Sequence, residues 1–170
     1  TLNSDAEKAV REGITQIILS DKMISETRLP MPMLLCIGAI NTHLIKLGLR
    51  GYISINVQTG DALDTHSFAT LIGVGATTVN PYLAFDSLFQ RHSKKLFGKF
   101  SFDECVSRYI KSVNFGLLKI MSKMGISVLS SYRGGCNFET VGLSRTIVKD
   151  YFPGVAVSYT HLTLPTILPV

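Results

Sequence analysis

Residues 52–79, YISINVQTGDALDTHSFATLIGVGATTV, hold the pattern of a strand, a helix and a second strand in direct succession. Tyr52–Val57 alternates apolar and polar side chains, which is typical of a half-buried strand. Asp64 is placed to cap a helix that runs to the residue before Gly75, and Ala76–Val79 predicts the next strand. Because strands joined through a helix run parallel, this stretch predicts one crossover unit of a parallel sheet.

The residues before this unit predict two further helices and one further strand. Ser4 and Glu7 have capping-box spacing, so a helix should begin at Ser4 and end at Gly13. Ile14–Ser20 is short, apolar and β-branched, and it predicts a strand that is buried on both faces. A helix follows from about Met33 to Leu47, where the next glycine ends it.

The residues after the unit continue the alternation. Asn80 and Pro81 predict the start of a helix through Phe89. A capping box at Ser101–Glu104 opens the strongest helical pattern of the chain, which Gly125 ends. The pattern closes with one strand and two short helices, predicted at Ile126–Ser130, Asn137–Gly142 and Arg145–Phe152.

Strands that alternate with helices of this length indicate right-handed crossovers and a mainly parallel sheet. The predicted fold class is therefore α/β, and we expect a partial (β/α)-barrel-like domain. Periodicity by itself does not distinguish a barrel from an open sheet. A chain of 170 residues is long enough to bury one substantial core.

Composition narrows the classes of protein. With 46% hydrophobic and 17% charged residues, the chain has the composition of a folded domain. The net charge of +5 includes no long basic block, so we expect no nucleic-acid partner. The apolar runs are shorter than the roughly 18 residues of a membrane span, and no signal peptide is recognisable, so we expect a cytoplasmic protein without a membrane partner.

The three cysteines, Cys36, Cys105 and Cys136, are far apart in the sequence. No C-x-x-C pair or Cys/His ligand spacing accompanies them, which argues against a disulfide framework, a zinc site or a local iron–sulfur loop. The pattern predicts buried, reduced thiols.

Two short motifs resemble sites but have simpler interpretations. The glycines of Gly73-Val74-Gly75 follow a predicted helix, whereas a dinucleotide loop precedes one, so helix termination and close packing explain them better. Asp64 and His66 do not share a helix face, and no G-x-S-x-G accompanies them. We interpret Asp64 as a helix cap, His66 as a first-turn polar residue and His43 as having no catalytic partner.

Three other stretches remain candidates for binding. Ser130–Gly135 lies between a predicted strand and helix and offers hydroxyls, the Arg133 guanidinium and backbone amides, so it could bind phosphate or carboxylate, tie loops together or dock on a neighbouring domain. Asp21 and Thr59–Asp61 should meet at the carboxyl ends of two parallel strands and border a pocket. A basic and aromatic cluster is expected to be a solvated helix end or a docking segment, and it comprises Arg91, His92, Lys94, Lys95, Phe97 and Phe100.

Several blocks, in order along the chain, resemble the central domain of the glutamate synthase large subunit. These blocks are Gln16–Asp21, Pro32–Leu35, Gly38-Ala39, Thr59–Ala62, His66–Ala76, Val79–Ala84, Leu118–Ser127, Ser131–Gly134, Phe138-Glu139 and Val141–Leu143. The chain departs from the family by showing His66-Ser67 in place of two histidines, and a single His43 in place of a histidine run. These departures argue against catalysis by either histidine.

The resemblance implies a modular enzyme that makes glutamate from glutamine and 2-oxoglutarate. Such an enzyme has an amidotransferase domain with an N-terminal cysteine, a central domain, and an FMN barrel with a 3Fe-4S cluster, and it takes electrons from NADPH through an FAD-containing flavoprotein subunit or from ferredoxin. Residues 1–156 match the later part of the central domain. No catalytic, cofactor-binding or metal-binding residue carries over to this sequence, so we expect an inactive structural linker between the amidotransferase and FMN domains.

Two alternatives to the linker stay open. One is a free-standing phosphate- or flavin-binding α/β domain that uses Arg133, and the other is a non-catalytic interaction module with a large exposed apolar surface. Residues 157–170 are set apart, because their sequence resembles the translation of a sequencing-library adapter. We expect this tail to pack poorly and to contribute to no sheet.

Overall fold

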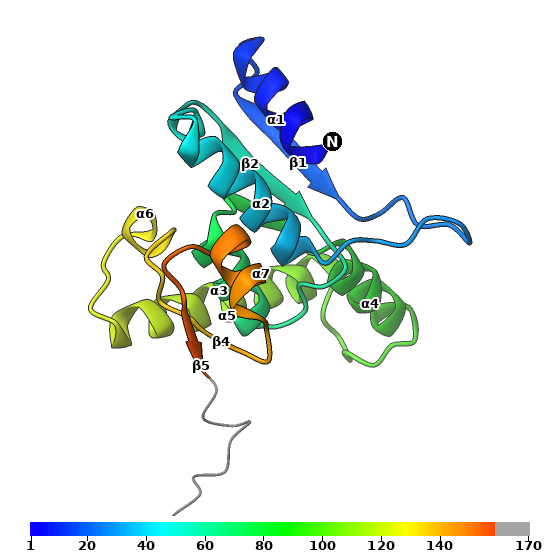
Figure 1. Cartoon of the computed structure of the whole chain (residues 1–170). Helices are drawn as coiled ribbons and strands as arrows, with labels where there is room; N and C mark the ends of the chain where they lie inside the picture. Colours follow the sequence, from blue (N-terminus) through cyan, green and yellow to red (C-terminus); the bar gives the residue numbers. More distant parts are fainter. Residues whose placement is uncertain (159–170) are drawn as a thin grey trace, which may run out of the picture.

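The computed structural model describes residues 1–158. Three parallel strands form the main sheet, helices flank it, and two short strands form a second sheet (Figure 1). In chain order the elements are α1 Leu2–Arg11, β1 Gln16–Ser20, α2 Met33–Lys46, the 3-10 turn η1 Arg50–Tyr52, β2 Ser54–Gln58, α3 Thr65–Val74, β3 Thr78–Asn80, α4 Tyr82–Ser93, α5 Phe102–Lys123, α6 Leu129–Tyr132, β4 Glu139–Val141, α7 Arg145–Tyr151 and β5 Ala156–Ser158.

The main sheet has the order β1-β2-β3, so each strand lies beside the next one along the chain. Leu19, Val57 and Val79 pair across the three strands on one face. Leu19, Ile55 and Val57 are buried and belong to the core that α1, α2 and α3 complete. The α/β fold class with parallel strands is confirmed; the main sheet remains open at its β1 and β3 edges and does not close into a barrel within residues 1–158.

The other face of this sheet carries mostly polar side chains. Ser20 donates a hydrogen bond to Gln58 at 2.8 Å, and Thr78 donates to Asn56 at 2.7 Å, so neighbouring strands are joined by side chains. Ile18 lies on this face and is 72% exposed. The prediction that Ile14–Ser20 is buried on both faces is therefore wrong, because the packed helices cover only the face that carries Leu19.

Helix α7 packs on α2. Thr42 donates a hydrogen bond to the carbonyl of Tyr151 at 3.2 Å. A Cβ atom on Gly38 would lie 2.6 Å from the same carbonyl oxygen, so only glycine allows this close approach of α7 to α2. The predicted helix at Arg145–Phe152 is thereby confirmed as α7.

Several other predicted elements are also confirmed. Asp64 caps α3 by accepting a hydrogen bond from the Ser67 backbone at 2.8 Å. Ser101 and Glu104 form both bonds of a capping box at the start of α5. The helix predicted at Met33–Leu47 is α2, and the helix predicted from Pro81 to Phe89 is α4, which ends about one turn later, at Ser93.

Three local predictions are wrong. Helix α1 begins at Leu2 with Thr1 as its cap, and Ser4 lies inside the helix. Ile126–Ser130 is not a strand: it is a loop that leads into α6, and the apolar side chains of Val128, in the loop, and Leu129, in α6, are exposed. Asn137–Gly142 contains strand β4, because Glu139–Val141 pairs in parallel with β5.

The tail prediction fails at its first two residues, since Val157 and Ser158 belong to β5 and pair with β4. The expected poor packing of Leu162, Leu164 and Ile167 concerns positions outside the described residues. Of the helices in residues 1–158, none is long and apolar enough to cross a membrane.

Candidate functional site

The carboxyl ends of β1 and β2 meet, as the parallel sheet predicts. The Asp21 carboxylate accepts a hydrogen bond from the Thr59 hydroxyl at 2.5 Å and from the Gly60 amide at 3.1 Å. The Thr59 side chain is fully buried. Asp21 is therefore held by donors from the neighbouring strand end, and its observed role is to join the two loops.

A residue of α4 completes this strand-end cluster. A Cβ atom on Gly60 would lie 3.2 Å from the Tyr82 hydroxyl oxygen, so the tyrosine lies directly against the glycine turn. Burial raises the pKa of Tyr82, and the negative charge of Asp21 raises it further. Lys22 lies 5.7 Å from the centre of the Tyr82 ring, so the cluster combines a carboxylate, a phenol and an ammonium group.

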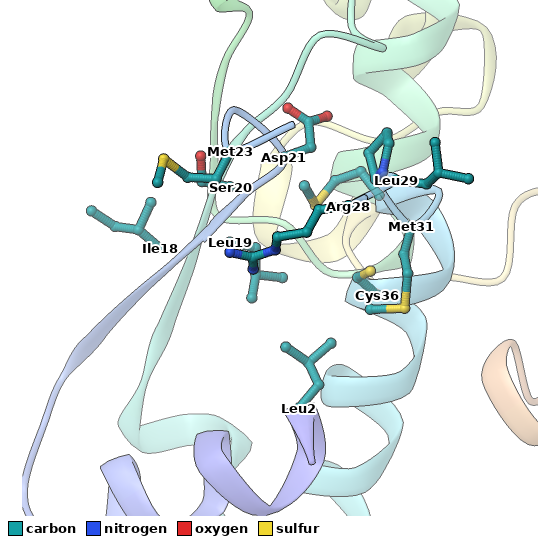
Figure 2. Close-up of a pocket in the computed structure, with 12 residues that line it drawn as sticks. Leu2, Ile18, Leu19, Ser20, Asp21, Met23, Arg28, Leu29, Met31 and Cys36 are labelled. Carbon is teal, nitrogen blue, oxygen red and sulfur yellow. The ribbon is translucent and has the colours of Figure 1, made fainter. Parts of the chain in front are cut away.

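A pocket of about 340 Å³ opens beside Asp21, between β1, the loop that follows it and the start of α2 (Figure 2). Its lining is largely apolar, and the Arg28 side chain extends across it toward Leu19. Burial raises the pKa of the Cys36 thiol, which therefore stays protonated. Among the described lining residues no hydroxyl or thiol is hydrogen-bonded to a base.

The Ser130–Gly135 turn does not form the predicted phosphate cradle. The Gly134 amide donates to the Gly73 carbonyl at 2.8 Å, and the Gly135 amide donates to the Tyr132 carbonyl at 3.2 Å. Tyr132 is 1% exposed, and its ring packs edge-on against Phe138. The Gly134 amide bonds to the end of α3, so the turn ties two parts of the chain together. This is one of the alternatives that the sequence left open.

The glycine pair at the end of α3 is explained by packing. A Cβ atom on Gly73 would lie 2.1 Å from the Phe138 ring, and one on Gly75 would lie 2.7 Å from Asn41. Gly75 also has a φ of 149°, a conformation that side chains disfavour. The interpretation as helix termination and close packing is confirmed.

The histidines also have structural surroundings. His43 lies 3.0 Å from the Glu7 carboxylate and ties α2 to α1. The pKa of Glu7 is lowered by its hydrogen bond to Arg11 and, to a lesser degree, by the one to His43. His66 is exposed, and Asp64 is engaged by Ser67, whose hydrogen bonds lower its pKa. The structure does not bring these residues into a catalytic set.

The basic cluster lies at the end of α4 and in the loop after it. Lys94 and Lys95 are exposed, as a solvated helix end requires. His92 contacts the Phe100 carbonyl at 3.1 Å, and the Arg108 guanidinium lies 4.0 Å from the Phe100 ring centre. These contacts fold the loop back on α5.

Sequence reasoning missed Arg50, whose guanidinium joins three elements. It donates to the Asn41 side chain at 2.7 Å, to the Ile53 carbonyl at 2.6 Å and to the Gly75 carbonyl at 2.8 Å. Burial lowers its pKa. No sequence motif could have indicated this role, since the three acceptors meet only in the folded chain.

The three cysteines lie on separate elements of the described residues and do not come together as ligands of a cluster. Cys36 on α2 and Cys105 on α5 are buried, as predicted, but the prediction of a buried thiol is wrong for Cys136, which is exposed in the loop before β4. Across residues 1–158 no group of three His, Cys, Asp or Glu side chains could hold a metal ion. The Gly134 and Gly135 amides, which the sequence offered as donors to a phosphate, are hydrogen-bonded to carbonyls of the chain itself.

The fold is a parallel α/β domain, and its polar side chains form hydrogen bonds between its helices, strands and loops. The chain belongs to the glutamate synthase central domain family, whose model matches residues 1–144. It is 51% identical over 154 residues to the glutamate synthase [NADPH] large chain of Azospirillum brasilense, covering 91% of this chain and 10% of that protein. The Bacillus subtilis (strain 168) glutamate synthase [NADPH] large chain is 45% identical, covering 96% of this chain and 11% of that protein. The chloroplastic ferredoxin-dependent glutamate synthase of Spinacia oleracea is 43% identical, covering 94% of this chain and 10% of that protein. The chain thus spans about a tenth of the length of these relatives.

Proposed function

We propose that this chain is the later part of the central domain of a glutamate synthase large chain and works as a structural linker in the synthesis of glutamate from glutamine and 2-oxoglutarate. The observation that carries this proposal is the 51% identity to a relative of which the chain spans only a tenth. The proposed partners are the amidotransferase and FMN domains of the same large chain and, less directly, a flavoprotein small subunit. The segment would position these domains and shield the path of ammonia between them.

The exposed surface of the described residues supports the proposal that other domains pack against this segment. Large apolar side chains are exposed at several separate places, among them Ile18 at 72%, Leu29 at 87% and Phe115 at 71%. Ile18, Met23, Leu29 and Met31 are all exposed and line one pocket, so apolar side chains gather at that place. A contiguous exposed apolar patch is typical of a surface that another protein segment covers. The packed interior supports the same role, because its polar groups tie elements together and leave no paired nucleophile and base in the strand-end pocket.

Catalysis and cofactor binding are proposed to lie outside this segment, with FMN and a 3Fe-4S cluster carried by the neighbouring barrel. The electron donor of the parent would be NADPH or ferredoxin, since relatives of both kinds are similar to this chain. A cytoplasmic location is proposed because the three cysteines are free, as is usual in a reducing compartment.

A chimera tests the linker role. Residues 1–144 replace the matching segment of the Azospirillum brasilense large chain, and glutamine hydrolysis, bound FMN and glutamine-dependent glutamate synthesis are measured separately. We expect all three to be retained. The 170-residue chain alone should neither hydrolyse glutamine nor bind FMN, and either activity in it would refute the proposal.

A further inference from the structure

The main sheet has an open edge along β1. Strand β1 pairs with β2 over its whole length, and no other strand of residues 1–158 pairs with it. The Asp21 amide, directly after β1, donates to the Gln58 carbonyl at 3.2 Å and so points toward β2. Because backbone groups alternate in direction along a strand, those of Gln16, Ile18 and Ser20 point away from β2, toward the open edge.

The helices that cover this sheet show where a further strand would lie (Figure 1). Helix α2 joins β1 to β2 and α3 joins β2 to β3, and both pack on the face that carries Leu19, so each crossover moves the chain by one strand in the same direction. Helix α1, which leads into β1, contacts α2, and its Ala6 and Val10 are buried in the same core. Crossovers between parallel strands are almost always right-handed. A strand joined to β1 through α1 would therefore lie on the open side of β1.

The pocket of about 340 Å³ lies on the same side of β1. Its described lining residues come from α1, β1, α2 and the loop between β1 and α2, and none belongs to β2 or β3. Leu2 of α1, Leu19 of β1 and Cys36 of α2 line it together (Figure 2). Leu19 pairs with Val57, and Val57 pairs with Val79. A further parallel strand beside β1 would continue this row with a side chain that lies in the pocket.

We propose that the open edge of β1 binds a fourth parallel strand, formed by the segment of the parent large chain that leads into α1. This inference rests on the proposed function, because the occupant is part of the same large chain, of whose relatives this chain spans about a tenth. Inward-facing apolar side chains of that strand fill the pocket beside Leu19, and its backbone bonds to the outward groups of Ile18. A small ligand would fill the pocket but would leave the backbone groups along β1 unpaired.

The experiment compares three forms of the 170-residue chain by amide hydrogen exchange, followed by ¹⁵N NMR. The first form is unmodified. The second carries at its N-terminus the segment that precedes the matching residues in the Azospirillum brasilense large chain, about 20 residues, which is enough for a strand and its connection to α1. The third carries the same residues in scrambled order. The Leu19 amide is the internal control, because it points toward β2 and should be protected in all three forms.

We expect the Ile18 amide to exchange about tenfold or more slowly in the second form than in the other two. The native extension should also raise the Tm by about 5 °C or more, because it buries apolar area in the pocket. Equal exchange of the Ile18 amide in all three forms would overturn the proposal, as would equal protection by the scrambled extension. Protection in the unmodified chain that increases with protein concentration would overturn it too, and would assign the edge to a second copy. Glutamate synthesis in the chimera tests the linker role separately, so each proposal can fail without the other.

Discussion

A pair of isoleucines on adjacent strands tests whether the helices cover only one face of the main sheet. Ile55, in the central strand β2, is fully buried among side chains of the core, whereas Ile18, in β1, is 72% exposed on the other face. Truncating a fully buried isoleucine to alanine costs about 2–5 kcal/mol, because transfer free energy is lost and a cavity remains. Ile18 is 72% exposed, so its truncation removes little buried apolar area. Ile18→Ala should therefore cost less than about 1 kcal/mol of unfolding free energy.

The assay is thermal unfolding, followed by far-UV circular dichroism because the chain contains no tryptophan. For a domain of this size, the loss expected for Ile55→Ala corresponds to a decrease in Tm of roughly 5–15 °C. Ile18→Ala should remain within a few degrees of the unmodified chain. Equal losses in the two variants would refute the one-sided packing of the sheet.

Other substitutions test local features in the same assay. Gly73→Ala should lower the free energy of unfolding by about 1–3 kcal/mol through overpacking against an aromatic ring, while Gly51→Ala, which has open space around it, should not. Asp64→Ala should cost about 1 kcal/mol by removing the cap of α3. Because the folded-state pKa of Asp64 is lowered, its contribution is complete above an unfolded pKa of about 3.9 and is lost as the pH falls through the folded value; a pH series should show the variant and the unmodified chain converging in acid. Iodoacetamide should modify the exposed Cys136 before the two buried cysteines, as peptide mass analysis after timed labelling would detect.

The parts of the fold that the sequence predicts well are those whose cause is local. Asp64 and Ser101 cap helices by bonding amides three residues away, so neighbouring sequence is sufficient to identify them. The same spacing fails at Ser4, because Glu7 bonds instead to Arg11 and His43 and the helix continues back to Leu2. The Glu7 carboxylate is thus used by Arg11 of the same helix and by His43 of α2, and it does not cap Ser4.

The strand-end cluster was predictable for a topological reason, and the three hydrogen bonds of Arg50 were not. Asp21 and Thr59 each follow a strand, and parallel pairing brings both to one edge whatever the details of packing. The contacts of Arg50 depend on how α2, η1 and α3 dock on one another. An apolar run such as Ile126–Ser130 is equally ambiguous, since its side chains become buried as a strand only if a neighbouring strand is available.

The open sheet also limits where a neighbouring segment can dock. The exposed polar face already satisfies much of its hydrogen bonding through the Ser20–Gln58 and Asn56–Thr78 pairs, so water solvates it at little cost. The β1 edge and the loop after it differ, because Ile18, Met23 and Leu29 are apolar and more than two-thirds exposed there. Edge strands of this kind are ready to pair with a further strand. We therefore expect the adjoining part of a large chain to cover the β1 edge, in which case Ile18→Ala would destabilise the chimera more than it destabilises the isolated chain.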